Sequence, residues 1–293
     1  MQKIICLLSG MLLCSFMLVS CGGNDEDNPT PSPPSPSIPE KPTQNGDIDI
    51  AFSFNYVNGK DERTLLQCES YTQEQKDSLQ TAFSNALDKV NDKRGKVVTA
   101  ATFLVSLKYR IPYGHEWKVS DTHEYDYVGR YTKKGLFLNA FTENGVSHKP
   151  WGCLIPTHPR YPRETIANLG DYYENGLHCS SFVGWALYNG DAVTDVALLE
   201  KTYANGYRTF PRTTEVTLKG NADLIRPGDL IGFPGHIAMV IGIKGDIVVY
   251  ASAEGGSAYP GKGLSWLTFN KKTTNFDSFS YKYFIQMNKV YGD

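Results

Sequence analysis

Three apolar stretches joined by tight turns follow one another between residues 229 and 252, and this run constrains the fold more than any other part of the sequence. It reads DLIGFPGHIAMVIGIKGDIVVYAS, with a Pro-Gly corner and a Lys-Gly-Asp turn. These signals predict strands over 229–233, 236–243 and 247–252 that are joined as hairpins. The sequence therefore predicts an antiparallel sheet in this part of the chain.

Helical patterns come before these strands. Thr72–Asp92 is rich in Gln, Glu, Lys, Leu and Ala, with Thr72 as its N-cap, and a second helix is predicted over about Lys96–Tyr109, before Pro112. Alternating residues predict one early strand over Ile48–Val57 and a final strand in SYKYFIQMNKVY. Helices first and antiparallel strands afterwards predict an α+β domain with the sheet packed on a helix.

Residues 176–190, GLHCSSFVGWALYNG, predict a short amphipathic helix with one thiol, Cys179, in its first turn. A helix N-terminus presents backbone N–H groups and the positive end of the dipole, so a thiolate is favoured there. On position alone, a nucleophile and a buried structural cysteine fit equally well. A second short helical piece is predicted within 191–206.

The first twenty residues carry one lysine and then a continuous apolar run, which is the pattern of a secretory signal. They end in LVSC, which resembles the bacterial lipoprotein cleavage box and implies that Cys21 becomes a lipidated membrane anchor. An ordinary cleaved signal with a cysteine nearby is the alternative. The next stretch, 21–47, is acidic and then rich in proline, so it is expected to be a disordered tether. An outer-membrane lipoprotein facing the periplasm or the cell surface is therefore expected.

Charge bears on the class of binding partner, and the number of cysteines bears on which thiol is left unpaired. The formal net charge of −2 gives no electrostatic argument for a nucleic-acid partner. Beyond the signal and Cys21 the chain holds three cysteines, Cys68, Cys153 and Cys179. An odd number in an exported protein suggests a reactive thiol or an intermolecular bond. If Cys68 and Cys153 pair, which the sequence leaves open, Cys179 is the remaining thiol.

A cysteine nucleophile needs a base, commonly a histidine that is close in space. His236 opens an apolar strand directly after a Pro-Gly corner, so its imidazole is expected at an end of the sheet, where it can face a cleft. An ordinary solvent-facing histidine has the same local pattern. No two histidines have the three- or four-residue spacing of a helical metal site, so no metal is expected. Gly256–Gly263 has the glycines of a phosphate loop but lacks its final hydroxyl, so no cofactor is expected.

The order of these features resembles the NlpC-type family of cell-wall cysteine peptidases, which are papain-like. The family pattern is a D-C-S-G-F-like segment at a helix start, then a G-D-L strand, then an H-V-G-I-Y-type strand. The matching blocks here are His178–Phe182, Gly228–Leu230 and His236–Val240. Upstream, Pro112, Tyr113 and Gly114 resemble the segment that follows the family's first helix. The resemblance spans about residues 95–256 in interrupted blocks.

This resemblance implies a papain-like catalytic domain over 95–293, with the strand and helix of 48–94 packed on it. It also implies hydrolysis of an amide bond in peptidoglycan stem peptides, by default the γ-D-glutamyl to diamino-acid bond. Cys179 would be the nucleophile and His236 the general base that takes its proton. Tyr250 stands where the family has a polar residue that orients the imidazole.

Other residues could serve the site in further roles. Glu254 and Asp246 are possible substitutes for Tyr250 in orienting the imidazole, because both are acidic and close to it in sequence. The candidate substrate-binding residues are Tyr113, His178, Ser180 and Glu254.

The chain departs from the family pattern in two places. His178 stands where the family usually has an aspartate that helps to bind the stem peptide, and an imidazole cannot replace a carboxylate as the partner of a free ammonium group. Tyr113 and Cys179 are 66 residues apart (179 − 113), which is far more than the family has between these positions. The insertion over about 115–175 is rich in aromatic residues, such as Trp151, which could form a wall of the cleft or part of the core. Two alternatives stay open: an amidase or acyl transferase on another substrate, and a non-catalytic wall-binding scaffold.

Overall fold

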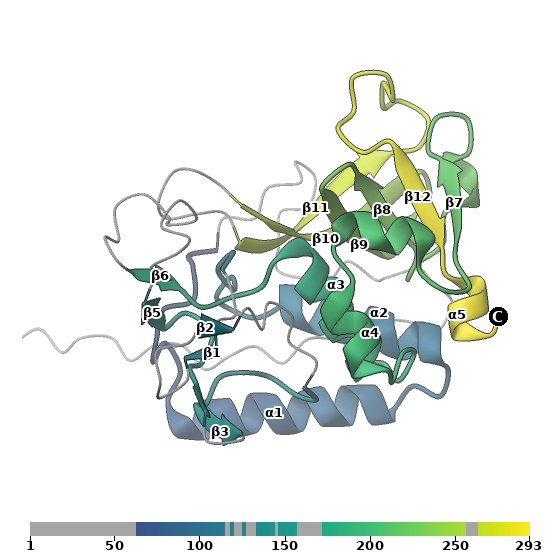
Figure 1. The fold of residues 1–293 in the computed structure, drawn as a ribbon. Coiled ribbons are helices and arrows are strands. Elements are labelled where there is room, and N and C mark those ends of the chain that lie inside the picture. The colour runs from purple at the N-terminus through teal and green to yellow at the C-terminus, as the bar shows by residue number, and fades with distance from the viewer. Residues whose placement is uncertain are drawn as a thin grey trace, which may run out of the picture. The chain divides into compact units, whose positions relative to one another are not determined.

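The computed structural model describes residues 63–114, 118–119, 125–126, 133–143, 146–156, 172–255 and 263–293 (Figure 1). All of them belong to one unit, Ser35–Asp293. The signal, Cys21, the tether and the strand predicted over 48–57 lie outside the described residues. No helix in the described ranges has the length and apolar character needed to cross a membrane.

Two helices, α1 (Gln73–Asp88) and α2 (Lys93–Val105), come first, as predicted, although the second one begins and ends earlier than the predicted 96–109. The Thr72 hydroxyl accepts a hydrogen bond from the Gln75 N–H, and the Gln75 side chain accepts one from the Thr72 N–H, so α1 begins with a capping box. Asp92 accepts a hydrogen bond from the first turn of α2 at 2.6 Å. The prediction that α1 extends to Asp92 was wrong, because this residue is the N-cap of the next helix.

The main sheet has six antiparallel strands in the order β11-β10-β9-β8-β12-β7. Its strands are β7 (Thr214–Thr217), β8 (Leu230–Phe233), β9 (His236–Lys244), β10 (Ile247–Glu254), β11 (Gly263–Asn270) and β12 (Tyr283–Gln286). The antiparallel strands β8, β9 and β10 are confirmed. The final strand is shorter than predicted, because β12 ends at Gln286 and a helical turn, α5 (Asn288–Tyr291), follows.

The helix that carries the thiol is confirmed as α3 (Cys179–Asn189). The helical piece predicted within 191–206 consists of α4 (Val196–Lys201) followed by the 3-10 helix η3 (Ala204–Thr209). A further 3-10 turn, η4 (Ala222–Leu224), precedes β8.

Alternation along β9 gives the two faces of the sheet different cores. Ile237 and Met239 pack in the same cluster as Phe182 of α3, and α2 and α3 lie on this face of the sheet (Figure 1). Ala238 and Val240 point to the other face, where a second cluster includes Tyr250, Phe269, Tyr281 and Phe284. The described part of the chain is therefore an α+β domain with an antiparallel sheet packed on the thiol-bearing helix, as predicted.

Short strands occur in the described parts of the insertion over 115–175. They are β1 (Lys118–Val119), β2 (Tyr125–Asp126), β3 (Phe141–Glu143), β4 (Val146–His148), β5 (Leu154–Pro156) and β6 (Tyr172–Glu174). Trp151 is 2% exposed and its ring meets that of Trp185 of α3, so this aromatic residue of the insertion belongs to the core.

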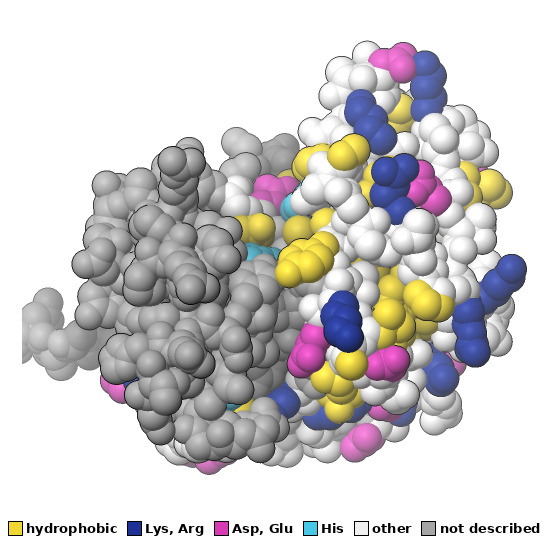
Figure 2. Space-filling view, viewed as in Figure 1, with side chains coloured by type: hydrophobic (Ala, Val, Ile, Leu, Met, Phe, Trp, Pro, Cys, Tyr) yellow, Lys and Arg dark blue, Asp and Glu magenta, His cyan; other side chains and the backbone are white. Residues whose placement is uncertain are grey.

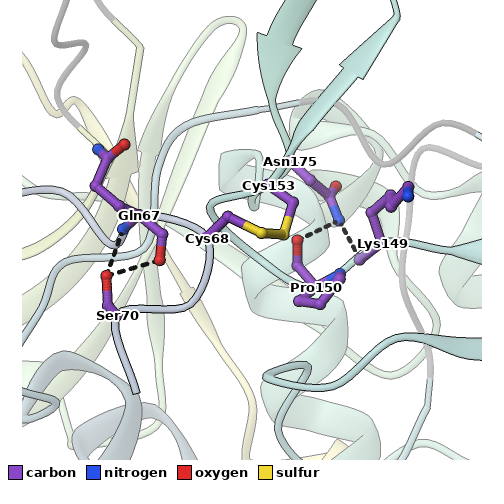
Figure 3. The surroundings of a disulfide bond; sticks show 7 residues. All are labelled: Gln67, Cys68, Ser70, Lys149, Pro150, Cys153 and Asn175. Atoms are coloured by element: carbon purple, nitrogen blue, oxygen red, sulfur yellow. Dashed lines mark hydrogen bonds between the residues drawn. A yellow bond between two sulfur atoms is a disulfide. The ribbon is translucent and has the colours of Figure 1, made fainter. Parts of the chain in front are cut away.

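A disulfide bond joins Cys68 to Cys153 across 85 residues, so the pairing considered from the sequence is confirmed (Figure 3). Backbone hydrogen bonds also join Cys153 and its neighbour Gly152 to Asn175, which lies shortly before α3. The Cys153 carbonyl accepts from the Asn175 N–H at 2.8 Å, and the Gly152 N–H donates to the Asn175 carbonyl at 2.8 Å. The disulfide therefore secures the segment from which the chain enters α3.

Candidate functional site

Cys179 is the first residue of α3, it is buried, and it carries a thiol outside the disulfide. His178 precedes it in an extended conformation as the N-cap residue, with its N–H donating to the Ser181 Oγ at 2.7 Å. The Phe182 N–H closes the first turn on the His178 carbonyl at 2.9 Å. The thiol thus lies in the first turn of an 11-residue helix, where the backbone N–H groups and the dipole favour a negative charge.

Two extended segments cross just before this helix, and glycines make the crossing possible. A Cβ added to Gly176 would lie 2.0 Å from the Pro112 carbonyl oxygen, and one added to Gly114 would lie 2.1 Å from the Glu174 carbonyl oxygen. The Leu177 N–H donates to the same Pro112 carbonyl at 3.1 Å. The segment 112–114, singled out by the family resemblance, is therefore held directly beside the start of α3.

Tyr113 brings three of the predicted substrate-binding residues into one place. Its ring centroid lies 5.0 Å from that of His178. A Cβ added to Gly255, which directly follows Glu254 at the end of β10, would lie 3.1 Å from the Tyr113 ring. Ser180, the fourth predicted residue, is 4% exposed, and its carbonyl accepts from the Tyr207 hydroxyl at 3.3 Å, so its contacts belong to the interior.

His236 is the first residue of β9, and its Nε2 lies 2.8 Å from the Ser252 Oγ of β10. The Phe233 ring stacks on the imidazole, with centroids 5.0 Å apart at 25°. Tyr250 was predicted to orient this imidazole, but the side chain that hydrogen-bonds it is Ser252. The Tyr250 ring instead meets the Tyr281 ring edge-on, with centroids 5.0 Å apart, and the Tyr281 hydroxyl lies 3.2 Å from the Ser252 Oγ.

The surroundings of His236 favour its neutral form. Burial lowers the pKa of His236, and the charge of Glu254 opposes this shift. Of the two acidic residues considered from the sequence, Glu254 therefore lies within electrostatic reach of the imidazole. Asp246 lies in the turn that follows β9, at the far end of that strand from His236. Burial also raises the pKa of Tyr250 and of Tyr281, so both phenols keep their protons.

Cys179 and His236 have a common neighbour in Tyr281. Burial is the main cause that raises the pKa of Tyr281, and a negative charge on Cys179 adds a smaller contribution in the same direction. The Tyr281 ring centroid in turn lies 5.9 Å from that of His236, and α3 packs against both β9 and β10. Tyr281 therefore lies within electrostatic reach of the predicted nucleophile and in ring contact with the predicted base.

Asp229 of the G-D-L block has a structural role. It is fully buried, forms an ion pair with Arg94 of α2 at 3.1 Å, and accepts hydrogen bonds from the backbone N–H groups of Arg226 and Met287. Arg94 also donates to Asp293 and reaches Tyr291 with its guanidinium group. This network ties α2 to the start of β8 and to the last residues of the chain.

Sequence reasoning missed Ser252, Tyr281 and Arg94 as contributors to the site and its support. Ser252 lies in the Tyr-Ala-Ser segment that was compared with the family, so the right segment was found and the wrong residue chosen. Tyr281 lies in the stretch predicted as the last strand, and nothing local distinguishes it from its tyrosine neighbours. Only the pairing of β8 with both β9 and β12 brings it to His236.

Two of the candidate residues, Tyr113 and Glu254, lie within two residues of stretches that the structure does not describe. Figure 2 shows histidine side chains beside apolar and acidic ones where the described surface meets residues that are not described. Among the described residues, no three His, Cys, Asp or Glu side chains are grouped so that they could hold a metal ion. A pocket of about 290 Å³ lies at the other end of α3, around Asn189 and Asp191, and includes none of the candidate residues.

No protein-family model matches the chain, and neither a curated protein nor a solved structure matches it.

Proposed function

We propose that the protein is an exported, lipid-anchored cysteine hydrolase of papain-like, NlpC-type fold that cleaves an amide bond in peptidoglycan stem peptides. The observation that carries this proposal is the placement of a thiol at a helix start and a hydrogen-bonded, half-buried imidazole around Tyr281. The ordered resemblance of Cys179, Asp229 and His236 to the family supports the fold and the substrate class. By default the bond cleaved is the γ-D-glutamyl to diamino-acid bond.

In this mechanism the Cys179 thiol gives its proton to His236, and the thiolate attacks the carbonyl carbon of the scissile amide. Nε2 of His236 is engaged with Ser252, so Nδ1 is the nitrogen that takes the proton. The tetrahedral oxyanion is stabilised by the Cys179 backbone N–H in the first turn of α3. The amine leaves with the proton from the imidazolium, and water then hydrolyses the thioester with His236 again as base.

Substrate contacts in this proposal come from Tyr113, His178 and Glu254. The ring contact between Tyr113 and His178 forms an aromatic surface beside the nucleophile, and Glu254 adds an acidic group at the end of β10. Flat apolar faces of this kind suit peptide bonds and sugar rings.

A second candidate is favoured by His178, which is 8% exposed and occupies the position of the family's substrate-binding aspartate. Without that carboxylate the position offers no ion pair to a free N-terminal ammonium group. An amidase or acyl transferase that acts on a substrate with a blocked N-terminus fits this arrangement. A wall-binding scaffold without activity is the outcome that the experiment below must separate from both.

The membrane part of the proposal rests on the sequence. A lipid on Cys21 would hold the chain in the outer membrane, and the proline-rich stretch would place the catalytic domain in the periplasm or at the cell surface, within reach of peptidoglycan peptides.

The test compares the full chain in detergent with its Cys179→Ala variant on defined peptidoglycan fragments, with and without N-terminal sugars, read by mass spectrometry. Cleavage by the first and not the second supports the enzyme, and the new termini identify the bond and the need for a free L-alanine. If neither cleaves, the rate at which iodoacetamide alkylates Cys179 decides between the two remaining candidates. Rapid alkylation of Cys179 near neutral pH indicates an enzyme with another substrate, and slow alkylation indicates a scaffold.

A further inference from the structure

We propose that Ser252 and Tyr281 form a relay of hydroxyl groups that holds the His236 imidazole with its proton on Nε2, so that Nδ1 is left to accept the thiol proton of Cys179. The hydrogen bonds of the relay are contacts between side chains of the structure. Their use in catalysis rests on the proposed function. Ser252 and Tyr281 are thus positioning residues, and they replace the single polar side chain that the family resemblance placed at Tyr250.

Ser252 makes the first contact of the relay. Its Oγ lies 2.8 Å from the His236 Nε2 and 3.2 Å from the Tyr281 hydroxyl, and the residue is fully buried. A buried hydroxyl has one proton to donate and lone pairs to accept with, and it cannot turn to solvent for either. Its proton is therefore given either to His236 or to Tyr281.

Tyr281 is the second hydroxyl of the relay, and its ring contacts hold it in a fixed position. It is 4% exposed, and its ring meets Phe233, Tyr250 and His236 edge-on, with centroids 5.6, 5.0 and 5.9 Å away. Its hydroxyl bonds to Ser252. Because burial raises the pKa of Tyr281, its phenol keeps its proton and the relay is uncharged.

The direction of the relay decides which ring nitrogen of His236 carries the proton. In one direction Nε2–H donates to Ser252, and Ser252 donates to Tyr281. In the reverse direction Ser252 donates to Nε2, and the ring proton is on Nδ1, where it prevents uptake of the thiol proton.

The first direction is the one that serves both states of the reaction. Once Nδ1 has accepted the thiol proton, the imidazolium has N–H groups on both nitrogens, so Nε2 must donate to Ser252. A relay that already runs this way needs no reorientation when the proton moves, and such preorganised dipoles lower the cost of the charged state.

The test uses the full chain in detergent, labelled with ¹⁵N-histidine. Long-range ¹H–¹⁵N correlation spectra distinguish protonated from unprotonated ring nitrogens, and a His236→Gln variant identifies the signals. We expect the neutral His236 to be protonated on Nε2, and Ser252→Ala and Tyr281→Phe to give a mixture of both tautomers. Ser252→Thr, which keeps a hydroxyl, restores the single tautomer.

Tyr291→Phe is the matched control, because Tyr291 is a buried tyrosine whose hydroxyl donates to the Gly228 carbonyl at 2.7 Å, away from the relay. We expect this variant to keep the wild-type tautomer of His236. A proton on Nδ1 in the wild type, or an unchanged tautomer in both Ser252→Ala and Tyr281→Phe, overturns the relay. Tyr281→Phe retains the ring, so the test remains decisive if Ser252→Ala fails to fold.

A second readout separates the relay from the proposed function. The titratable groups that act on His236 or on Tyr281 are Glu254, Tyr250 and Cys179, so the rate of Cys179 alkylation is followed over pH in every variant. We expect the rate at neutral pH to fall about tenfold in Ser252→Ala and in Tyr281→Phe, and to be unchanged in Tyr291→Phe. If the tautomers respond as expected but no peptidoglycan fragment is cleaved, the proposed function fails and the relay holds. If wild type, Ser252→Ala and Tyr281→Phe cleave equally well, the relay has no positioning role and the function stands.

Discussion

The His236 Nε2 and the Ser252 Oγ lie 2.8 Å apart on neighbouring strands, β9 and β10. In the register of this pair Ala251 lies opposite Met239, so Ser252 follows on the face that carries Ala238 and His236. The orientation of the candidate base is therefore set by the pairing of two strands. Groups fixed on paired strands keep their geometry better than groups on loops.

The lowered pKa of His236 predicts how stability depends on pH. Above about pH 6.5 the imidazole is neutral in both states, whereas below it the unfolded chain takes up a proton that the folded chain resists. Stability should therefore fall on acidification through this range, by at most about 1.4 kcal/mol per pH unit from this group. Urea unfolding at pH 7.5 and 5.5 should show a larger loss for the wild type than for His236→Gln. Equal losses would contradict the shift.

The sequence contained enough information for the helices, the three central strands and the position of the thiol, because hydrophobic periodicity, caps and turns are local signals. It did not predict β7 or β11. β11 follows the glycine-rich 256–262, and its burial comes from pairing with β10 along the whole strand. Ser252 and Tyr281 were missed for a related reason: their contacts with His236 depend on register and on strand order, which no local pattern specifies.

Gly176→Ala should weaken both the fold and the site. The added methyl group would lie 2.0 Å from the Pro112 carbonyl oxygen, so the crossing before α3 must open. We expect a loss of about 1–3 kcal/mol in the free energy of unfolding and slower alkylation of Cys179. Thermal unfolding and iodoacetamide kinetics measure the two effects.

Gly206→Ala is the control for that substitution. A Cβ at Gly206 would make an ordinary contact of 3.4 Å with Thr202, so stability and thiol reactivity should stay close to those of the wild type. If Gly176→Ala behaves like Gly206→Ala, the close approach at Pro112 does not hold the start of α3.

The ion pair of Arg94 with Asp229 should be costly to break. Asp229→Ala removes the fully buried partner of the Arg94 guanidinium, which then keeps only the partly exposed Asp293 as a carboxylate partner, and we expect a loss of about 3 kcal/mol in urea unfolding. The double variant Arg94→Met/Asp229→Leu should lose less than Asp229→Ala alone, because no buried charge remains. Asp277→Ala, which breaks the exposed pair with Lys219, should leave the unfolding midpoint unchanged. A double variant less stable than the single one would contradict this account.

The disulfide should stabilise the domain and the approach to α3 together. It closes a loop of 85 residues, and the loop entropy of the unfolded chain predicts that Cys68→Ser/Cys153→Ser lowers the free energy of unfolding by about 4–5 kcal/mol. A reducing agent should lower the unfolding midpoint of the wild type toward that of the double variant and have no effect on the variant itself. Because Gly152 and Cys153 exchange hydrogen bonds with Asn175, three residues before His178, Cys179 alkylation should also slow in the double variant under conditions where it is still folded. Unchanged alkylation with the expected loss of stability would show that the bond supports the fold without positioning the thiol.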